Sequence, residues 1–353
     1  MRHLGPMGRL GIGIPVAILG TLLAVTPVLA CGGLIGPNGA VNLLRTTTLA
    51  GYHDGIEHYV TSFEFAGGGG AFGSITPLPG IPTTVVKGGD WTLQRLIRET
   101  SPVQFDSAVR ASAPAASGAE ELMKVKIDAL DITVLRGGGA DIGQWATKHG
   151  FRLPPDSPEV LDFYAQRSPI FLAAAFDADA AAGRGQQVGD GTPVHITIPT
   201  DNPWVPLRIL ALGKTGTEAV QADVYLLTDH APALLPAPTG KNGIRLDHSA
   251  AASDSLLTDL RSDRGMEWIP SSAWLTKVAV DGEAAQLSYD LAVDASGAGA
   301  PSAIDAGLTM PGSPPLSSPV DFTRLLLALG FAALGLLGIG LMAGARPNRP
   351  LAG

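Results

Sequence analysis

The chain has almost no cysteine: Cys31 is the single one in 353 residues. An internal disulfide is therefore excluded, and the fold must rest on its own apolar core.

Basic residues are also few. Once the five arginines and one aspartate of the terminal segments are set aside, residues 31–320 have 19 basic and 31 acidic residues, a formal charge of −12. A body this acidic does not attract nucleic acid or anionic lipid headgroups, so neither partner is expected.

Recognisable catalytic motifs are missing as well. The sequence has no Gly-x-Ser-x-Gly elbow and no His-Glu-x-x-His motif. Gly213-Lys214-Thr215 is similar to the end of a phosphate loop, but the glycine required five residues before Gly213 is Arg208. We therefore assign no catalytic, cofactor-binding or metal-binding residue from the sequence, and we expect no cofactor.

One long apolar run is present near the C-terminus. Residues 325–345 contain no charged side chain, and about 20 apolar residues suffice for a helix to cross a bilayer. Arg346 and Arg349 follow the run, which predicts a cytoplasmic tail over residues 346–353. The sequence therefore predicts a single-pass protein of the cell membrane, with everything from residue 31 to the span outside the membrane.

The first thirty residues have the pattern of a secretory signal peptide. A positive start with Arg2 and Arg9 precedes an apolar run over residues 10–25, and small residues lead up to Ala30. Cys31 then has two interpretations. It is the mature N-terminus after simple cleavage, or it is the attachment site of a lipid on its thiol. Leu29 is unusual for a lipoprotein signal, and a protein already held by a helix gains little from a second anchor.

The body has a composition typical of turn-rich β structure, with 45 glycines and 28 prolines. Asp54-Gly55 lies between two β-rich runs, at 46–53 and 56–65, and predicts a hairpin. Asp281-Gly282 predicts a second hairpin in the same way, between strands at 274–280 and 285–293. Single strands are expected over residues 122–135 and 204–212, and the proline-containing stretch 72–80 is expected at a sheet edge.

Helices are fewer. They are expected over residues 91–100 with Asp90 as the N-cap, over 141–150, and from Ser157 onward. Strands that alternate irregularly with a few short helices predict an α+β fold, mostly antiparallel, over an extracytoplasmic domain at residues 31–294. A weak internal similarity suggests two related halves divided near residue 135. Residues 295–319 are rich in Ala, Gly, Ser and Pro and predict a flexible stalk.

Several segments are similar to one bacterial family. They are CGG at 31–33, RTTTLAGYHDGIEHYVTSFEF at 45–65, GGDWTLQRL at 88–96 and HGFRLPPDSPEVLDFYAQRSPIFLAAAFD at 149–177. They resemble the secreted proteins of domain-of-unknown-function family 2330, over most of residues 31–290. The resemblance implies a signal peptide, an N-terminal Cys-Gly motif and often a C-terminal membrane helix, but no activity. This chain has one cysteine where many relatives carry more, so no disulfide or metal role is carried over.

The polar residues of the first hairpin include types that bind metal ions. His53, Glu57 and His58 lie close in sequence, but Glu57 and His58 are neighbours in a strand and point to opposite faces. At most two of the three side chains can converge. The favoured interpretation is a set of exposed polar residues near a turn.

Two functional hypotheses follow. The first is a binding or interaction module at the bacterial cell surface, with a protein or another envelope component as partner. The alternative is an envelope hydrolase whose active site is built from distant loops. A pocket gathering several of His53, His195, Asp201 and Asp229 with shifted pKa values would favour the enzyme. A broad exposed apolar patch would favour the binding module.

Overall fold

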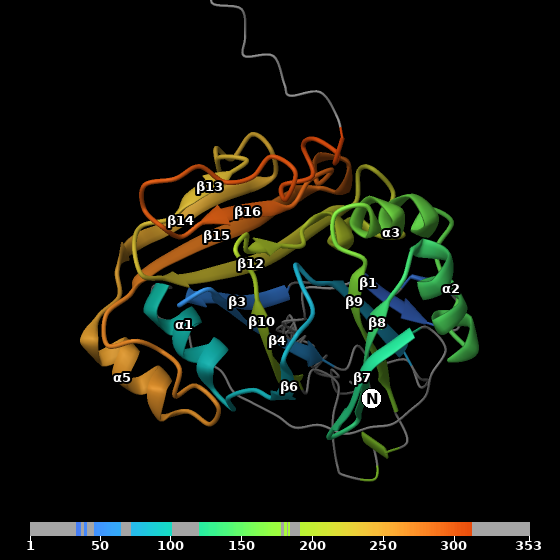
Figure 1. Cartoon of the computed structure of the whole chain (residues 1–353), viewed down its shortest axis with the longest axis horizontal. Coiled ribbons are helices and arrows are strands. Elements are labelled where there is room, and N and C mark those ends of the chain that lie inside the picture. Colours follow the sequence, from blue (N-terminus) through green and yellow to red (C-terminus); the bar gives the residue numbers. More distant parts are fainter. Residues whose placement is uncertain are drawn as a thin grey trace, which may run out of the picture.

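A computed structural model describes residues 33–36, 39–40, 46–64, 72–100, 120–177, 180–181, 183 and 191–312 (Figure 1). The predicted signal peptide, Cys31 and the predicted membrane helix at 325–345 lie outside these residues. Within the described ranges, no helix is both long and apolar enough to cross a membrane. The signal peptide, the state of Cys31 and the membrane anchor therefore stay predictions.

The largest element of the fold is a seven-stranded sheet, and its strands come from both ends of the body. All neighbouring strands are antiparallel except β12 and β3, which are parallel. The order across the sheet is β14 (Ile244–Ala251), β15 (Trp274–Glu283), β12 (Ala219–Thr228), β3 (Thr46–His53), β4 (Ile56–Glu64), β10 (Gly191–Pro199) and β6 (Thr84–Lys87).

Two further sheets complete the β structure, and four short α-helices and two 3-10 helices are described with them, so the predicted α+β class is confirmed for the described residues. The six-stranded sheet has the order β2 (Gly39–Ala40), β1 (Gly33–Gly36), β5 (Phe72–Pro77), β9 (Ile170–Phe176), β8 (Leu130–Arg136) and β7 (Glu120–Ile127). The three-stranded sheet has the order β11 (Trp204–Val205), β16 (Leu291–Asp294) and β13 (Ala233–Leu235). The helices are α1 (Thr92–Thr100), α2 (Gly139–Lys148), α3 (Ser157–Ala165), α5 (Asp254–Ser262), η1 (Arg208–Ala211) and η2 (Ala284–Gln286).

The helices cover the outer faces of the two large sheets, on opposite sides of the molecule (Figure 1). Because side chains alternate along a strand, Leu49 and Tyr225 pack with α1 and α5, whereas Ala50 and Val224 belong to the central core. That central core also contains residues of the six-stranded sheet, such as Leu172. The other face of the six-stranded sheet packs against α2 and α3. The two large sheets are therefore joined by one shared core.

The hairpin predicted at Asp54-Gly55 is confirmed. β3 ends at His53, β4 begins at Ile56, and the two turn residues have φ angles of 50° and 76°. Two consecutive positive φ angles are what a two-residue turn between twisted antiparallel strands requires, and Asp-Gly tolerates them. This turn places Tyr52 and Glu57 directly opposite each other.

Two strand predictions fail. Residues 72–80 were expected at a sheet edge, but β5 lies between β1 and β9 and is buried. Its prolines are tolerated because Pro77 is the last residue of the strand and Pro79 lies beyond it.

Residues 122–135 were expected as one strand, but they form the hairpin of β7 and β8. Asp128 has a φ angle of 56° and makes the turn where the chain reverses between the two strands.

The hairpin predicted over Asp281-Gly282 is also wrong. β15 continues through both residues to Glu283, because β12 begins early enough to pair with this extension. β16 joins the three-stranded sheet instead. The strand predicted at 204–212 is limited to the two residues of β11 and is followed by η1.

Helix starts show where local signals were misleading. α3 begins at Ser157 as predicted. α2 begins at Gly139, so Asp141 lies inside the first turn, where its carboxylate accepts a hydrogen bond from the backbone N–H of Gly138 at 2.9 Å. The helix predicted from residue 91 begins one residue later, so Trp91 precedes α1 and is 37% exposed.

The predicted division and stalk also differ from the described structure. Both large sheets mix strands from either side of residue 135, so the fold does not divide there. Part of the predicted stalk packs on the body: Ala306 is buried, and its carbonyl accepts a hydrogen bond from the backbone N–H of Asp290 at 2.9 Å. Gly307 lies against the ring of Phe163. Residues 313–319 of the predicted stalk lie outside the described residues.

Candidate functional site

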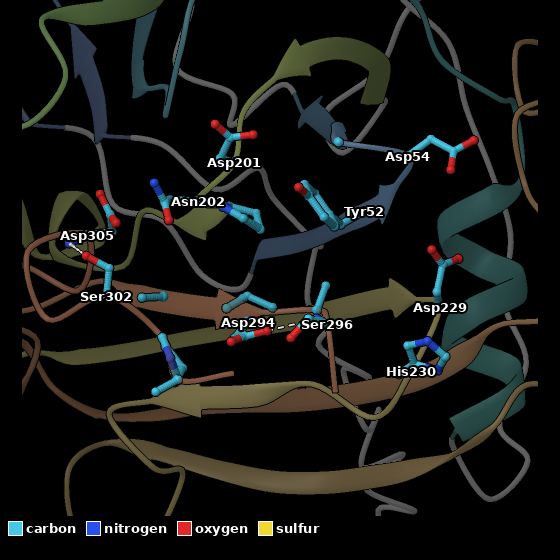
Figure 2. A pocket seen from close by; sticks show the side chains of 17 residues that line it. Tyr52, Asp54, Asp201, Asn202, Asp229, His230, Asp294, Ser296, Ser302 and Asp305 are labelled. Atoms are coloured by element: carbon cyan, nitrogen blue, oxygen red, sulfur yellow. Dashed lines mark hydrogen bonds between the residues drawn. The ribbon is translucent and has the colours of Figure 1, made fainter. Parts of the chain in front are cut away.

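The candidate site is an open hollow of about 530 Å³ where four separate segments of the chain meet. Tyr52 comes from the end of β3, and the Asp54-Gly55 turn follows it. The other segments are residues 201–203 after β10, residues 229–230 after β12, and residues 292–305 at and beyond β16. Figure 2 shows Tyr52 near the centre of the view, with the labelled aspartates around it. Strand ends from two sheets therefore build one concave surface.

The hollow is strongly acidic. Five aspartates line it, and the described residues of its lining include no lysine or arginine. A concave surface with charges of one sign concentrates the field and favours ligands of the opposite charge. The five residues are Asp54, Asp201, Asp229, Asp294 and Asp305.

Local hydrogen bonds hold part of this surface in place. Asp229 accepts a hydrogen bond from the ring nitrogen Nδ1 of His53, at 2.7 Å. Asp294 accepts one from the backbone N–H of Ser296, at 2.8 Å. These contacts fix two of the carboxylates while leaving them at the hollow.

Tyr52 forms an aromatic centre between the carboxylates. Its hydroxyl donates a hydrogen bond to the carbonyl of Thr200 at 3.0 Å. Burial, followed by the nearby charges of Asp201, Glu57 and Asp294, raises the pKa of the Tyr52 hydroxyl above its usual value of 10. The phenol is therefore neutral at physiological pH and adds no negative charge to the hollow.

Glu57 lies beside Tyr52 in the adjacent strand and is fully buried. Neither oxygen of its carboxyl group has a hydrogen-bond partner within the described structure. Burial raises the pKa of Glu57 from 4.5 to about 8. The nearby backbone of Trp204 offsets this rise only in part, since it lies outside hydrogen-bond distance of either oxygen. Glu57 is therefore mostly protonated at pH 7. The interpretation of Glu57 as an exposed polar residue near a turn is wrong, because its side chain is fully buried and lies close to the backbone of Trp204.

A second cluster lies on the opposite face of β4. His58 and His195 contact each other through ring nitrogens at 2.9 Å, and the ring of Trp268 stacks on His58 at 3.8 Å. Burial lowers the pKa of His58 to about 3 and that of His195 to about 4. Both rings are therefore neutral at pH 7. The sequence did not predict this pair, because 137 residues separate its members.

The residues proposed for an enzyme site are only partly brought together. Asp201 and Asp229 line the hollow, and His53 binds Asp229, but His195 belongs to the histidine pair under Trp268. Glu57 and His58 do face opposite sides, as predicted. Among the described residues, no group of three or more His, Cys, Asp or Glu side chains is arranged to hold a metal ion.

The exposed large apolar side chains of the described residues are spread over several segments of the chain, and no strand or helix among them carries more than one. They are Ile81, Val86, Trp91, Leu246, Ile304 and Leu308.

Comparison with known proteins gives a family and a remote structural likeness. A family model described as an uncharacterised protein conserved in bacteria matches residues 26–294. No curated protein matches the chain. The crystal structure of baculovirus P35 is 10% identical, with 71% of this chain and 96% of that chain covered at a TM-score of 0.36. The crystal structure of the caspase-8/P35 complex is 8% identical, with 71% of this chain and 96% of that chain covered at a TM-score of 0.36. Likenesses this remote carry no argument about function.

Proposed function

Since the chain belongs to this family of uncharacterised bacterial proteins, we propose that it is an extracytoplasmic binding module held at the cell membrane by residues 325–345. We further propose that it binds an envelope partner through the acidic hollow. The partner presents positively charged groups, such as lysine or arginine side chains. The signal pattern and the apolar C-terminal run support the location.

The observation that carries this proposal is the concentration of five aspartates around one aromatic ring in a concave surface. Carboxylates pair with ammonium and guanidinium groups, and an aromatic ring attracts cations through its face. Steering by such a surface raises the association rate of cationic partners and weakens as salt is added. Binding is therefore expected to be strongest at low ionic strength.

The test is site-specific photocrosslinking in intact cells that carry the full-length chain. A photoreactive residue at Asn202, which lines the hollow, is expected to capture a discrete partner. The matched control places the same residue at Ser249, an exposed position of β14. Replacing Asp54 and Asp201 together with Asn should reduce capture at Asn202 at least several-fold. Asn tolerates the left-handed backbone at position 54, so the turn is kept.

Capture at position 202 no stronger than at position 249 would show that the hollow is not a binding surface. Capture that is unchanged after both aspartates are neutralised would show that charge does not drive recognition.

The alternative, an envelope hydrolase, is favoured by one contact. His53 is held by the carboxylate of Asp229 at 2.7 Å, the arrangement in which an acid orients a general base. Ser296 and Ser302 line the same hollow and carry hydroxyl groups. Screening the full-length chain against envelope esters and glycans tests this function. A turnover that is lost in His53→Ala would replace the binding proposal with the enzyme.

A further inference from the structure

The histidine pair under Trp268 has a geometry that the proposed binding function does not use. Within the paired strands β4 and β10, His58 lies opposite Thr197 and His195 lies opposite Val60. The two histidines are therefore diagonal neighbours on one face of the sheet. His58 Nδ1 and His195 Nε2 are 2.9 Å apart, and the ring centroids are 5.2 Å apart. These distances place the two nitrogens between the rings, facing each other, with room for a single shared hydrogen.

The contact of the second ring nitrogen of His195 indicates which of the two facing nitrogens carries that hydrogen. The carbonyl of Gly265 accepts a hydrogen bond from the imidazole of His195. Since Nε2 faces His58, the nitrogen that donates to Gly265 is Nδ1, and Nε2 offers a lone pair toward His58. A histidine whose second N–H is held by a backbone carbonyl has the orientation and tautomer usual for metal-ligating histidines.

The surroundings are built closely around the pair. His58 is 9% exposed and His195 is 5% exposed. Trp268 lies on His58 with its ring plane within 2° of parallel. Gly51 is the direct cross-strand neighbour of His58, and a Cβ at that position would lie 2.2 Å from the Trp268 ring. A glycine is therefore required for the indole to reach the histidine.

We propose that His58 Nδ1 and His195 Nε2 form a two-nitrogen binding site for a soft monovalent metal cation, with Cu⁺ as the natural ligand. Imidazole nitrogen is a suitable ligand for copper and for zinc. Structural zinc sites use four ligands in a tetrahedron, whereas this pair supplies two nitrogens that face each other in line. A two-coordinate monovalent cation fits that arrangement.

Binding requires one small rearrangement and a balanced proton transfer. With metal–nitrogen bonds of about 2 Å, the two nitrogens must move apart by roughly 1 Å. The cation takes the place of the shared hydrogen, and that proton moves from Nδ1 to Nε2 of His58, so both rings stay neutral. The site gains one positive charge, and the nearby carboxylate of Glu267 favours that charge.

The test is anaerobic titration of the full-length chain, purified in detergent, with Cu⁺ in competition with a chromogenic Cu⁺ chelator. Ag⁺ serves as a second probe that does not change oxidation state. Every protein carries Cys31→Ser, because a thiolate would bind the same ions. One equivalent per chain is expected, with quenching of tryptophan fluorescence. His58→Gln and His195→Gln should each weaken binding at least 100-fold. The matched control is His230→Gln, which changes a histidine of the hollow.

Absence of stoichiometric binding, or binding retained in both His58→Gln and His195→Gln, would overturn the site. X-ray absorption at the copper edge of the Cys31→Ser protein decides the question even if those two variants fail to fold. Two nitrogen neighbours at about 2 Å support the site, and a first shell of sulfur refutes it. Neither result bears on the acidic hollow, because none of the changed ligands lines it.

Discussion

At the scale of single residues, the protein holds polar groups in environments that change their chemistry. Glu57 is the strongest case, since it is fully buried without a hydrogen-bond partner in the described structure. A carboxyl group in such a place is stable only in its protonated form. The sequence pattern indicated correctly that Glu57 and His58 face opposite sides of their strand. It could not indicate that both faces are buried, because that depends on distant segments, around Trp204 on the Glu57 side and around Trp268 on the His58 side.

Glu57 makes the stability of the protein depend on pH. Its pKa is 4.5 when unfolded and about 8 when folded. Between these values the folded state keeps a proton that the unfolded state has lost, so the free energy of unfolding falls as the pH rises. At about 1.4 kcal/mol per pKa unit, the fall is on the order of 4 to 5 kcal/mol. Glu57→Gln should therefore melt at a higher temperature than the wild type at pH 8.5, and this advantage should disappear toward pH 5.

Thermal melts across this pH range, with the exposed Glu283→Gln as control, measure the effect. A difference between Glu57→Gln and the wild type that does not change with pH would mean that Glu57 is ionised throughout.

At the scale of elements, the start of α1 shows how distant segments complete a local structure. The backbone N–H groups of Asp90 and Trp91 both donate to the carboxylate of Asp263, each at 3.0 Å, and the hydroxyl of Thr92 donates to it at 2.8 Å. Asp263 is the C-cap residue directly after α5. The sequence predicted Asp90 as the cap, but the cap comes from 173 residues further along the chain. One buried side chain therefore joins the end of α5 to the beginning of α1.

Asp263→Ala should destabilise the protein by about 1 to 3 kcal/mol, because it removes a cap and takes the partner from the buried hydroxyl of Thr92 and from two partly buried backbone N–H groups. Asp90→Ala is the matched control. It removes an exposed ion pair with Arg264 and should cost about 0 to 1 kcal/mol. Urea denaturation of both variants measures the difference. Equal losses would show that the carboxylate of Asp263 does not support the helix.

At the scale of the whole molecule, the aspartate at position 290 connects the helical layer to the three-stranded sheet. Its carboxylate accepts hydrogen bonds from the hydroxyl of Tyr164 and from the backbone N–H groups of Leu207 and Arg208. Arg167 donates to its other oxygen and also to the carbonyl of Asp305. These contacts fix the C-terminal part of the described body, which the composition alone had indicated to be a free stalk.

Asp290→Ala should be among the most damaging single changes, with a loss of about 3 to 5 kcal/mol, because it leaves the guanidinium of Arg167 buried without its partner. The double variant Asp290→Ala with Arg167→Met should recover part of that loss. Limited proteolysis after residue 300 reports whether this segment detaches. A single variant that melts like the wild type would show that the buried pair does not hold the segment.

The sequence by itself determined the features that depend on nearby residues. The Asp54-Gly55 turn, the opposite faces of Glu57 and His58, the start of α3 and the α+β class follow from backbone preferences and from alternation along a strand. The tertiary structure alone decided the acidic hollow, the capping of α1 by Asp263 and the meeting of His58 with His195. The physical reason is range. Turn chemistry and side-chain period act over a few residues, whereas the register between strands far apart in the chain is set by burying the shared core, and that register places the site residues.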